Sequence, residues 1–201
     1  MMFWLIGLLL FTVAGFAISI VGIDGYQYKR NQKIIQTLTS TPHSKTLVVF
    51  FSRSGNTELM ARKIALLKDA TVVPIQSKRD NIGFLGWIQA LKDARNITAE
   101  ITPSRMEMSA YDTIYIGSPI WLYSPAPQVF EFVKNNDFTG KKVILFNSMN
   151  SKFEQQYIDD FKAIVKKNGG TFEKHLYIIR GRMTQQMDTG SFLEEVEKLM
   201  E

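Results

Sequence analysis

Small hydroxyl and amide side chains that suit a phosphate group lie together at residues 52–57. This segment reads Ser-Arg-Ser-Gly-Asn-Thr, follows the apolar run 46–51 and precedes a helical pattern over 58–67. Because such a loop ends a buried strand and opens a helix, its backbone N–H groups and the helix's partial positive charge meet at one point. The hydroxyls add donors, and the glycine lets the backbone approach closely. The segment predicts a phosphate site, with an ordinary Ser or Asn helix cap as the alternative.

The same segment differs from two other phosphate-binding loops. No lysine follows Gly55, so the segment is not the nucleoside-triphosphate loop with its Gly-Lys-Ser/Thr ending. The three glycines of the dinucleotide fingerprint are also missing from it. The segment therefore favours a monophosphate over a triphosphate or a dinucleotide.

A second segment with binding chemistry spans residues 118–127 and contains three prolines. Their rings stiffen an extended path, and Trp121 and Tyr123 stand where a core strand is expected to have ended. A phosphate site beside a stiff aromatic wall fits a flat ring that carries a phosphate tail. The alternative is that the two aromatic rings pack on a neighbouring helix.

Strand-like and helix-like segments alternate through the rest of the chain, which is how these loops would be positioned. The expected strands are 46–51, 71–75, 112–117, 142–146 and 171–180, and the expected helices are 56–67, 83–95, 125–135, 153–166 and 191–200. Alternation with continuous apolar strands predicts a parallel sheet covered on both faces, an α/β sandwich of three layers. Ligands of such sheets bind beyond the carboxyl ends of the strands. We therefore expect the loops 52–57, 118–127 and 147–152 to converge.

Two of these segments resemble the flavodoxin family. Residues 52–57 are similar to its phosphate loop, and Tyr-Asp-Thr-Ile-Tyr-Ile-Gly-Ser-Pro-Ile-Trp at 111–121 is similar to its third strand and second flavin loop. The likeness continues through 125–133 and 138–142 and covers roughly 45–201. Paired motifs at this separation are far more specific than either alone. The resemblance implies a short-chain flavodoxin-like fold with a five-stranded parallel sheet in the order 2-1-3-4-5 and noncovalently bound FMN.

The resemblance also implies which residues contact FMN. The phosphate would be held by the first loop, through Ser52, Arg53, Ser54, Gly55, Asn56 and Thr57. The ribityl chain and the isoalloxazine ring would be lined by the second loop, through Pro119, Ile120, Trp121, Leu122 and Tyr123. The other side of the ring would lie against the third loop, through Asn147, Ser148, Met149 and Asn150. No side chain in these segments is expected to act as a catalytic base or nucleophile.

Residues 3–23 are apolar and uncharged, and as a helix they would rise about 31 Å, close to the thickness of a bilayer core. No Lys or Arg precedes this long stretch, which favours an uncleaved anchor over a cleaved signal peptide. The aromatic and basic flank at 26–33 places the remainder in the cytoplasm by the positive-inside rule. We expect a single-pass protein of the inner (cytoplasmic) membrane, with a transmembrane anchor at 1–24, a polar tether at 25–44 and an FMN-binding domain at 45–201 that faces the cytoplasm.

Composition limits the remaining chemistry of this 201-residue chain. It has no cysteine, which excludes disulfides, thiolate metal sites and cysteine nucleophiles. Its two histidines, His43 and His175, lie far apart in the sequence, so we expect no metal site. The net charge of +5 comes without an arginine-rich run, so we expect no nucleic-acid partner.

Three functions remain open from the sequence. The first is a membrane-tethered FMN protein that carries electrons between a reductase and a membrane or cytoplasmic acceptor, such as a partner protein or a quinone. The second is an NAD(P)H-dependent quinone or flavin oxidoreductase, although no separate nicotinamide fingerprint is present. The third is a scaffold or interaction module on a degenerate flavodoxin fold that binds no flavin. The first is favoured, and whether the protein is an enzyme stays open.

Overall fold

A computed structural model describes residues 2–39, 41–77, 99–182 and 185–201. In these residues one long helix precedes a domain in which strands and helices alternate, as the sequence predicts. The helix expected over 83–95 lies outside the described residues.

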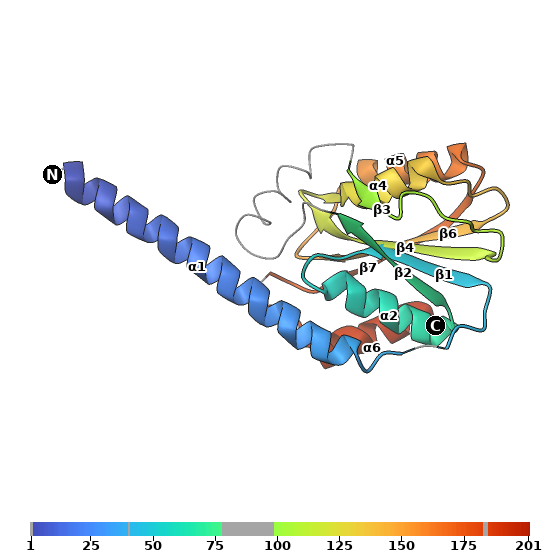
Figure 1. The fold of residues 1–201 in the computed structure, drawn as a ribbon, viewed down its shortest axis with the longest axis horizontal. Coiled ribbons are helices and arrows are strands. Elements are labelled where there is room, and N and C mark those ends of the chain that lie inside the picture. Colours follow the sequence, from blue (N-terminus) through green and yellow to red (C-terminus); the bar gives the residue numbers. More distant parts are fainter. Residues whose placement is uncertain (1, 40, 78–98, 183–184) are drawn as a thin grey trace.

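One sheet organises the domain (Figure 1). Its five long strands are β1 (Thr46–Phe51), β2 (Thr71–Ser77), β4 (Thr113–Trp121), β6 (Lys142–Met149) and β7 (Thr171–Ile179). They lie side by side in the order β2-β1-β4-β6-β7, and each neighbouring pair is parallel. Two strands of two residues, β3 (Ile101–Thr102) and β5 (Ser124–Pro125), pair antiparallel with β2 and β4. The described residues thus form a mostly parallel sheet of seven strands.

The prediction of a five-stranded, wholly parallel sheet is wrong in strand number and in the full order. That order is β3-β2-β1-β4-β6-β7, with β5 beside β4. The two extra strands are too short for a hydrophobic period to reveal them. The five long strands keep the expected relation among themselves, second-first-third-fourth-fifth along the chain. The carboxyl ends of β1, β4 and β6 are therefore neighbours, which brings the three predicted loops to one edge.

Helices cover both faces of the sheet (Figure 1). Among the described residues, the helices on the sheet are α2 (Asn56–Lys68), α4 (Pro127–Asn135), α5 (Gln155–Lys167) and α6 (Thr189–Met200). Alternate residues of β1 supply the two cores: Leu47 and Val49 pack with α4 and α5, and Val48 and Phe50 pack with α2 and α6. This double burial explains why the strand reads as a continuous apolar run rather than an alternating one.

Three strands run further than predicted towards the carboxyl edge, and the first of them, β2, ends at Ser77 rather than at 75. β4 ends at Trp121 rather than at 117, because residues 118 and 119 continue the parallel ladder with β6 and residues 120 and 121 pair with β5. β6 ends at Met149 rather than at 146, because it keeps pairing with β7 over that length. Parts of the second and third predicted loops are therefore strand, and their backbone groups are used in ladders.

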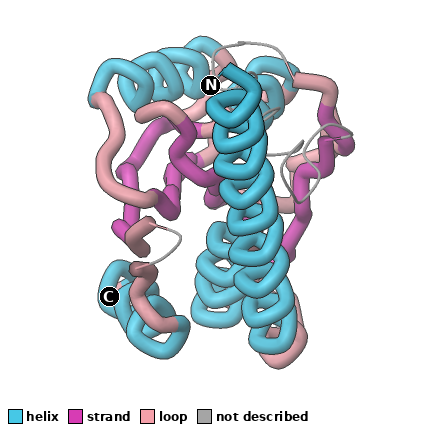
Figure 2. The backbone as a smooth tube through the Cα atoms, turned by 90° about the vertical axis from the view of Figure 1, so that its left-hand side faces the viewer, coloured by secondary structure: helices cyan, strands magenta, loops and turns pink. Residues whose placement is uncertain are grey.

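The first helix, α1 (Met2–Ile35), projects from the domain (Figure 1), and Figure 2 views the molecule from the side towards which it projects. Among the described residues, no helix combines the length and the apolar character needed to cross a membrane. The last turns of α1 lie against the domain, because Gln27, Asn31 and Ile35 are buried at a spacing of four residues, which is one helical face. The stretch 25–44, expected as a polar tether, is thus helical as far as Ile35.

Candidate functional site

The loop between β1 and α2 presents open backbone donors at the start of α2. Gly55 is the N-cap residue, with a φ of 86° in the left-handed region that favours glycine. No side chain of the described residues caps the helix, so the alternative of an ordinary Ser or Asn cap is wrong. Because the first N–H groups of a helix have no acceptor within it, they remain available here. The start of α2 therefore offers hydrogen-bond donors and partial positive charge to an anion.

Asn56, the first residue of α2, joins a network with two buried side chains from outside this loop. Arg180, just after β7, donates from Nη1 to Asn56 Oδ1 over 2.6 Å. Asn31 of α1 donates from Nδ2 to the same oxygen over 2.8 Å and to the Ser54 carbonyl over 2.9 Å. Since arginine is only a donor, the Asn56 oxygen must face Arg180, and the Asn56 NH2 group must point away from it. The network therefore holds a side-chain donor beside the open N–H groups of α2.

Arg180 places a buried positive charge behind this loop, since its side chain is only 2% exposed. Its other hydrogen-bond acceptors are neutral: Asn31 Oδ1 at 3.4 Å, Thr189 Oγ1 at 2.9 Å and the Met187 carbonyl at 3.5 Å. Burial and the neighbouring Arg30 cation lower the pKa of Arg180 to about 10, while Asp188 acts in the opposite direction. Arg180 is therefore charged at neutral pH. A buried cation held by neutral groups adds to the attraction for an anion at the start of α2.

A tight hairpin after β4 presents two exposed side chains. Trp121 of β4 pairs with Ser124 of β5, so Leu122 and Tyr123 form a two-residue turn. Their φ values are 44° and 73°, in the left-handed region that Asn and Gly normally occupy in such hairpins. Both side chains are about two-fifths exposed, and the Lys152 ammonium lies 5.0 Å from the centre of the Tyr123 ring. Large side chains kept in an unfavourable backbone conformation are typical of a functional turn.

Trp121 of the second predicted loop packs against the neighbouring strand β1. Its ring packs edge-on against Phe51 at a centroid distance of 5.4 Å. This contact agrees with the alternative of local packing for this residue, although the neighbour is a strand residue rather than a helix. Pro119 and Ile120 are half-buried and belong to β4, beside Trp121. These three residues form the strand that leads into the exposed hairpin.

The third predicted loop is mostly buried strand. Asn147 is completely buried and donates from Nδ2 to the Ser118 carbonyl over 2.7 Å, while its oxygen lies 2.8 Å from His175 Nε2. Ser148 and Met149 are also buried, and Asn150 is exposed just after β6. The expectation that residues 147–149 belong to a loop is therefore wrong, because β6 continues to Met149. The contact of these four residues with FMN stays a prediction.

The start of α2 and the end of β6 meet through a hydroxyl pair. Thr57 Oγ1 lies 2.9 Å from Ser148 Oγ, and both side chains are almost fully buried. Ser52, Arg53 and Ser54 are half-buried around the same turn. The structure therefore brings the start of α2 and the end of β6 together, as the convergence of the loops predicts.

Sequence reasoning missed Asn31 and Arg180. A signal existed for Arg180, because it is a charged residue at the carboxyl end of an expected strand, where ligands of parallel sheets bind. No signal marked Asn31, because it lies in the segment expected to be a tether outside the domain. Both donate hydrogen bonds to residues of the predicted phosphate loop.

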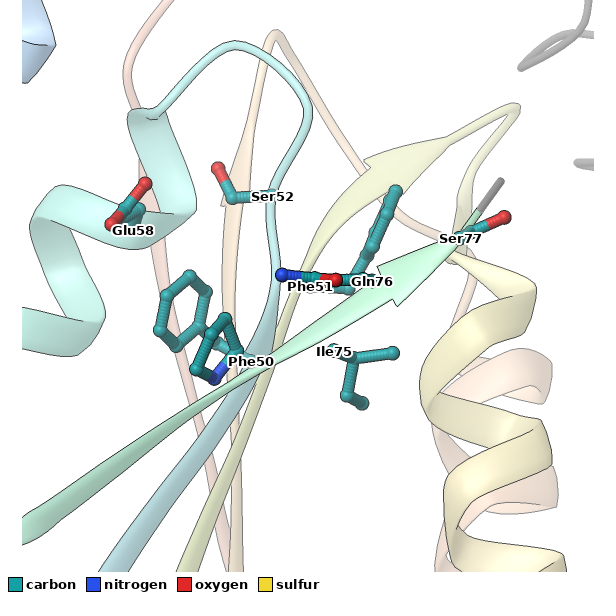
Figure 3. A pocket seen from close by; sticks show the side chains of 8 residues that line it. Phe50, Phe51, Ser52, Glu58, Ile75, Gln76 and Ser77 are labelled. Carbon is teal, nitrogen blue, oxygen red and sulfur yellow. The ribbon is translucent and has the colours of Figure 1, made fainter. Parts of the chain in front are cut away.

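A pocket of about 310 Å³ opens near the same edge of the sheet, and Figure 3 shows the side chains that line it. The lining residues are Phe50, Phe51, Ser52, Glu58, Pro74, Ile75, Gln76 and Ser77. They come from the ends of β1 and β2 and the first turn of α2. The pocket therefore shares Ser52 with the predicted cofactor residues but lies on the side of β1 away from β4.

These features define an α/β sandwich in which a helix start without a side-chain cap, after Gly55, offers donors to an anion at the carboxyl edge of the sheet. A family model described as Flavodoxin matches residues 45–186, and the chain belongs to this family. No curated protein sequence matches it.

Two solved structures share the fold. A candidate flavoprotein of Bacteroides uniformis ATCC 8492 has a TM-score of 0.58 and 23% identity, covering 77% of this chain and 98% of its own. A flavoprotein of Lactobacillus acidophilus NCFM in complex with FMN has a TM-score of 0.53 and 22% identity, covering 67% and 93%. The family match supports the cofactor that the resemblance implied.

Proposed function

We propose that this protein is a membrane-tethered FMN protein that carries electrons between a reductase and a membrane or cytoplasmic acceptor. The observation that carries the cofactor assignment is the start of α2. There, Gly55 leaves the backbone donors uncapped, and the buried Arg180 lies one side chain away, behind Asn56. Together they fit the phosphate of FMN, which is doubly negative near neutral pH. FMN is the cofactor that agrees with the family and with these donors.

The residues present fit both ends of this cofactor. The phosphate would be bound by the open N–H groups of α2, the hydroxyls of Ser52 and Ser54 and the NH2 group of Asn56. The ring would lie at the hairpin after β4, where Leu122 and Tyr123 are exposed. When bound, FMN supplies electron transfer through its isoalloxazine ring. The protein binds and orients the cofactor, and the nearby cations Arg180 and Lys152 favour its negatively charged groups.

Tethering to the membrane rests on the sequence of residues 3–23, which is uncharged and apolar over about the thickness of a bilayer core. The basic and aromatic residues of 26–33 then orient the domain towards the cytoplasm. Washing the membrane fraction with alkaline carbonate tests the tether: an anchored protein stays with the membrane pellet, and release into the wash would contradict it.

Absorption spectroscopy of the purified full-length protein tests the cofactor. We expect the two visible bands of oxidised flavin, and chromatography of the flavin released on denaturation should identify FMN. A colourless protein that takes up no added FMN would instead favour the scaffold. Mixing the flavin-loaded protein with NAD(P)H and a quinone distinguishes the remaining candidates. A carrier shows no turnover until a reductase is added, whereas direct consumption of NAD(P)H would favour an oxidoreductase.

A further inference from the structure

We propose that Asn31 of α1 is a positioning residue for the FMN phosphate, so that the last turns of α1 form part of the cofactor site. This inference rests on the proposed function, because it concerns how the same phosphate is held. It adds a segment outside the family match at 45–186 to that site.

One face of the last turns of α1 packs on the phosphate loop. Asn31 is completely buried, and Ile35 joins the core formed by α2 and α6. A Cβ atom added to Gly55 would lie only 3.0 Å from the Asn31 Cβ, so a side chain at this position would push the loop and the helix apart. Gln32 also donates to the Glu58 carboxylate over 3.4 Å. The last turns of α1 are therefore in direct contact with the first turn of α2 and the loop before it.

Asn31 sets the orientation of one peptide group in the loop. Its NH2 group donates to the Ser54 carbonyl over 2.9 Å, which turns that carbonyl towards α1. In a planar trans peptide the carbonyl and the following N–H point in opposite directions. The N–H of Gly55 is therefore directed away from α1. Without Asn31, the carbonyl would lose the partner that keeps this N–H in place.

Asn31 also sets the orientation of the Asn56 side chain. The Asn56 oxygen accepts from Asn31 over 2.8 Å and from Arg180 over 2.6 Å. Two donors on one oxygen fix which end of the amide faces inwards, and the NH2 end is left to face outwards. Arg180 in turn lies 3.4 Å from the Asn31 oxygen. Asn31 thus links the buried charge of Arg180 to the donor that would meet the phosphate.

Titration of the flavin-free full-length protein with FMN and with riboflavin, which lacks the phosphate, tests this role. We expect Asn31→Ala to weaken FMN binding about tenfold, because the phosphate would lose about one hydrogen bond from the donors that Asn31 holds in place. Riboflavin binding should not change. Asn31→Leu, which keeps the volume but not the donor, should behave in the same way. Gln36→Ala, an exposed amide just after the helix, is the matched control and should leave both affinities unchanged.

The outcomes separate the inference from the proposed function. Equal FMN affinity in the wild type and both Asn31 variants would overturn the inference and leave the FMN assignment intact. An equal loss for FMN and riboflavin would assign Asn31 to packing alone and also overturn it. A wild-type protein that binds neither flavin would overturn both proposals. In an Asn56→Ala background the loss from Asn31→Ala should shrink, and an undiminished loss would contradict the route through Asn56.

Discussion

The hydroxyl oxygens of Thr57 and Ser148 lie 2.9 Å apart in the interior, at the point where α2 begins and β6 ends. Ninety-one positions separate these residues in the sequence. Since each hydroxyl carries one hydrogen, only one of them can donate within the pair. The bond therefore ties the proposed phosphate loop to the sheet and leaves one hydroxyl hydrogen for another acceptor.

The Thr57–Ser148 pair predicts a measurable coupling energy. We expect Thr57→Val and Ser148→Ala each to lower the free energy of unfolding by about 1–2 kcal/mol, because each leaves a buried hydroxyl without its partner. The double variant should lose less than the sum, with a coupling of about 1 kcal/mol in urea unfolding of the flavin-free protein. Ser151→Ala, at an exposed position, is the control. Strictly additive losses would show that the two hydroxyls do not depend on each other.

Arg180 predicts a loss of stability on a substitution that keeps its charge. Arg180→Lys retains a cation but removes the planar fork that donates to Asn56 and Thr189. We expect the free energy of unfolding to fall by about 3 kcal/mol, because a buried cation loses hydrogen bonds that are each worth about 1.5–3 kcal/mol. The affinity for FMN should also fall, whereas the affinity for riboflavin should fall much less. Arg182→Lys, two residues on and exposed, should leave stability and binding unchanged; a similar loss there would remove the special role of Arg180.

Much of the fold follows from local patterns in the chain. The strand 46–51 is confirmed residue for residue, because its apolar run starts and stops at polar neighbours. The helices over 56–67 and 153–166 are confirmed to within two residues at each end. The convergence of the loops after β1 and β6 follows from the parallel order, and the hydroxyl pair of Thr57 and Ser148 bears it out.

The rest depends on tertiary contacts that no local pattern carries. Residues 147–149 read as a polar loop, yet Asn147 is buried because Ser118 and His175 satisfy its amide across two neighbouring strands. Asn31 reads as part of a linker, yet the Ser54 carbonyl and Arg180 hold it in the interior. In both cases the partner lies more than twenty residues away, so the residue's own surroundings in the sequence give no sign of its burial.

The hairpin after β4 predicts that a double substitution raises stability and weakens the contact with the flavin. Asn and Gly tolerate positive φ far better than Leu and Tyr do. We therefore expect the double substitution of Leu122→Asn and Tyr123→Gly to raise the unfolding free energy of the flavin-free protein by about 1 kcal/mol. It should also reduce the quenching of flavin fluorescence, because the exposed Tyr123 ring is lost. Both quantities can be followed on the same preparations.

A helical tyrosine provides the control for that experiment. Tyr157 is exposed to a similar degree but sits in α5, where the backbone is helical. Tyr157→Gly should lower the unfolding free energy by about 0.5 kcal/mol, because glycine disfavours a helix interior. Tyr157→Gly is thus expected to destabilise the protein, whereas the hairpin double substitution, which includes Tyr123→Gly, is expected to stabilise it. Destabilisation by the double substitution would show that the packing of the Leu122 and Tyr123 side chains outweighs the strain of their backbone.

His175 predicts how stability changes with pH. Burial lowers its pKa from 6.5 to about 4 in the folded protein. Because the Asn147 amide already donates to Ser118, its oxygen must accept from His175, which requires a proton on Nε2. Between pH 6.5 and 4 the unfolded chain therefore takes up a proton that the folded protein does not. The contribution of His175 to stability is complete above pH 6.5 and is lost as the pH falls towards 4.

Thermal unfolding of the flavin-free protein at a series of pH values tests this expectation against His175→Gln, whose side-chain amide can still donate to Asn147. The carboxylates of Asp137 and Asp188 also have lowered pKa values, from hydrogen bonds with Thr139 and Ser191, so both proteins lose stability at the acid end. The difference between the two proteins isolates the histidine. We expect the wild type to lose more stability than the variant between pH 6.5 and 4. Parallel curves would mean that His175 takes up its proton equally well in the folded protein, which its partly buried contact with Asn147 argues against.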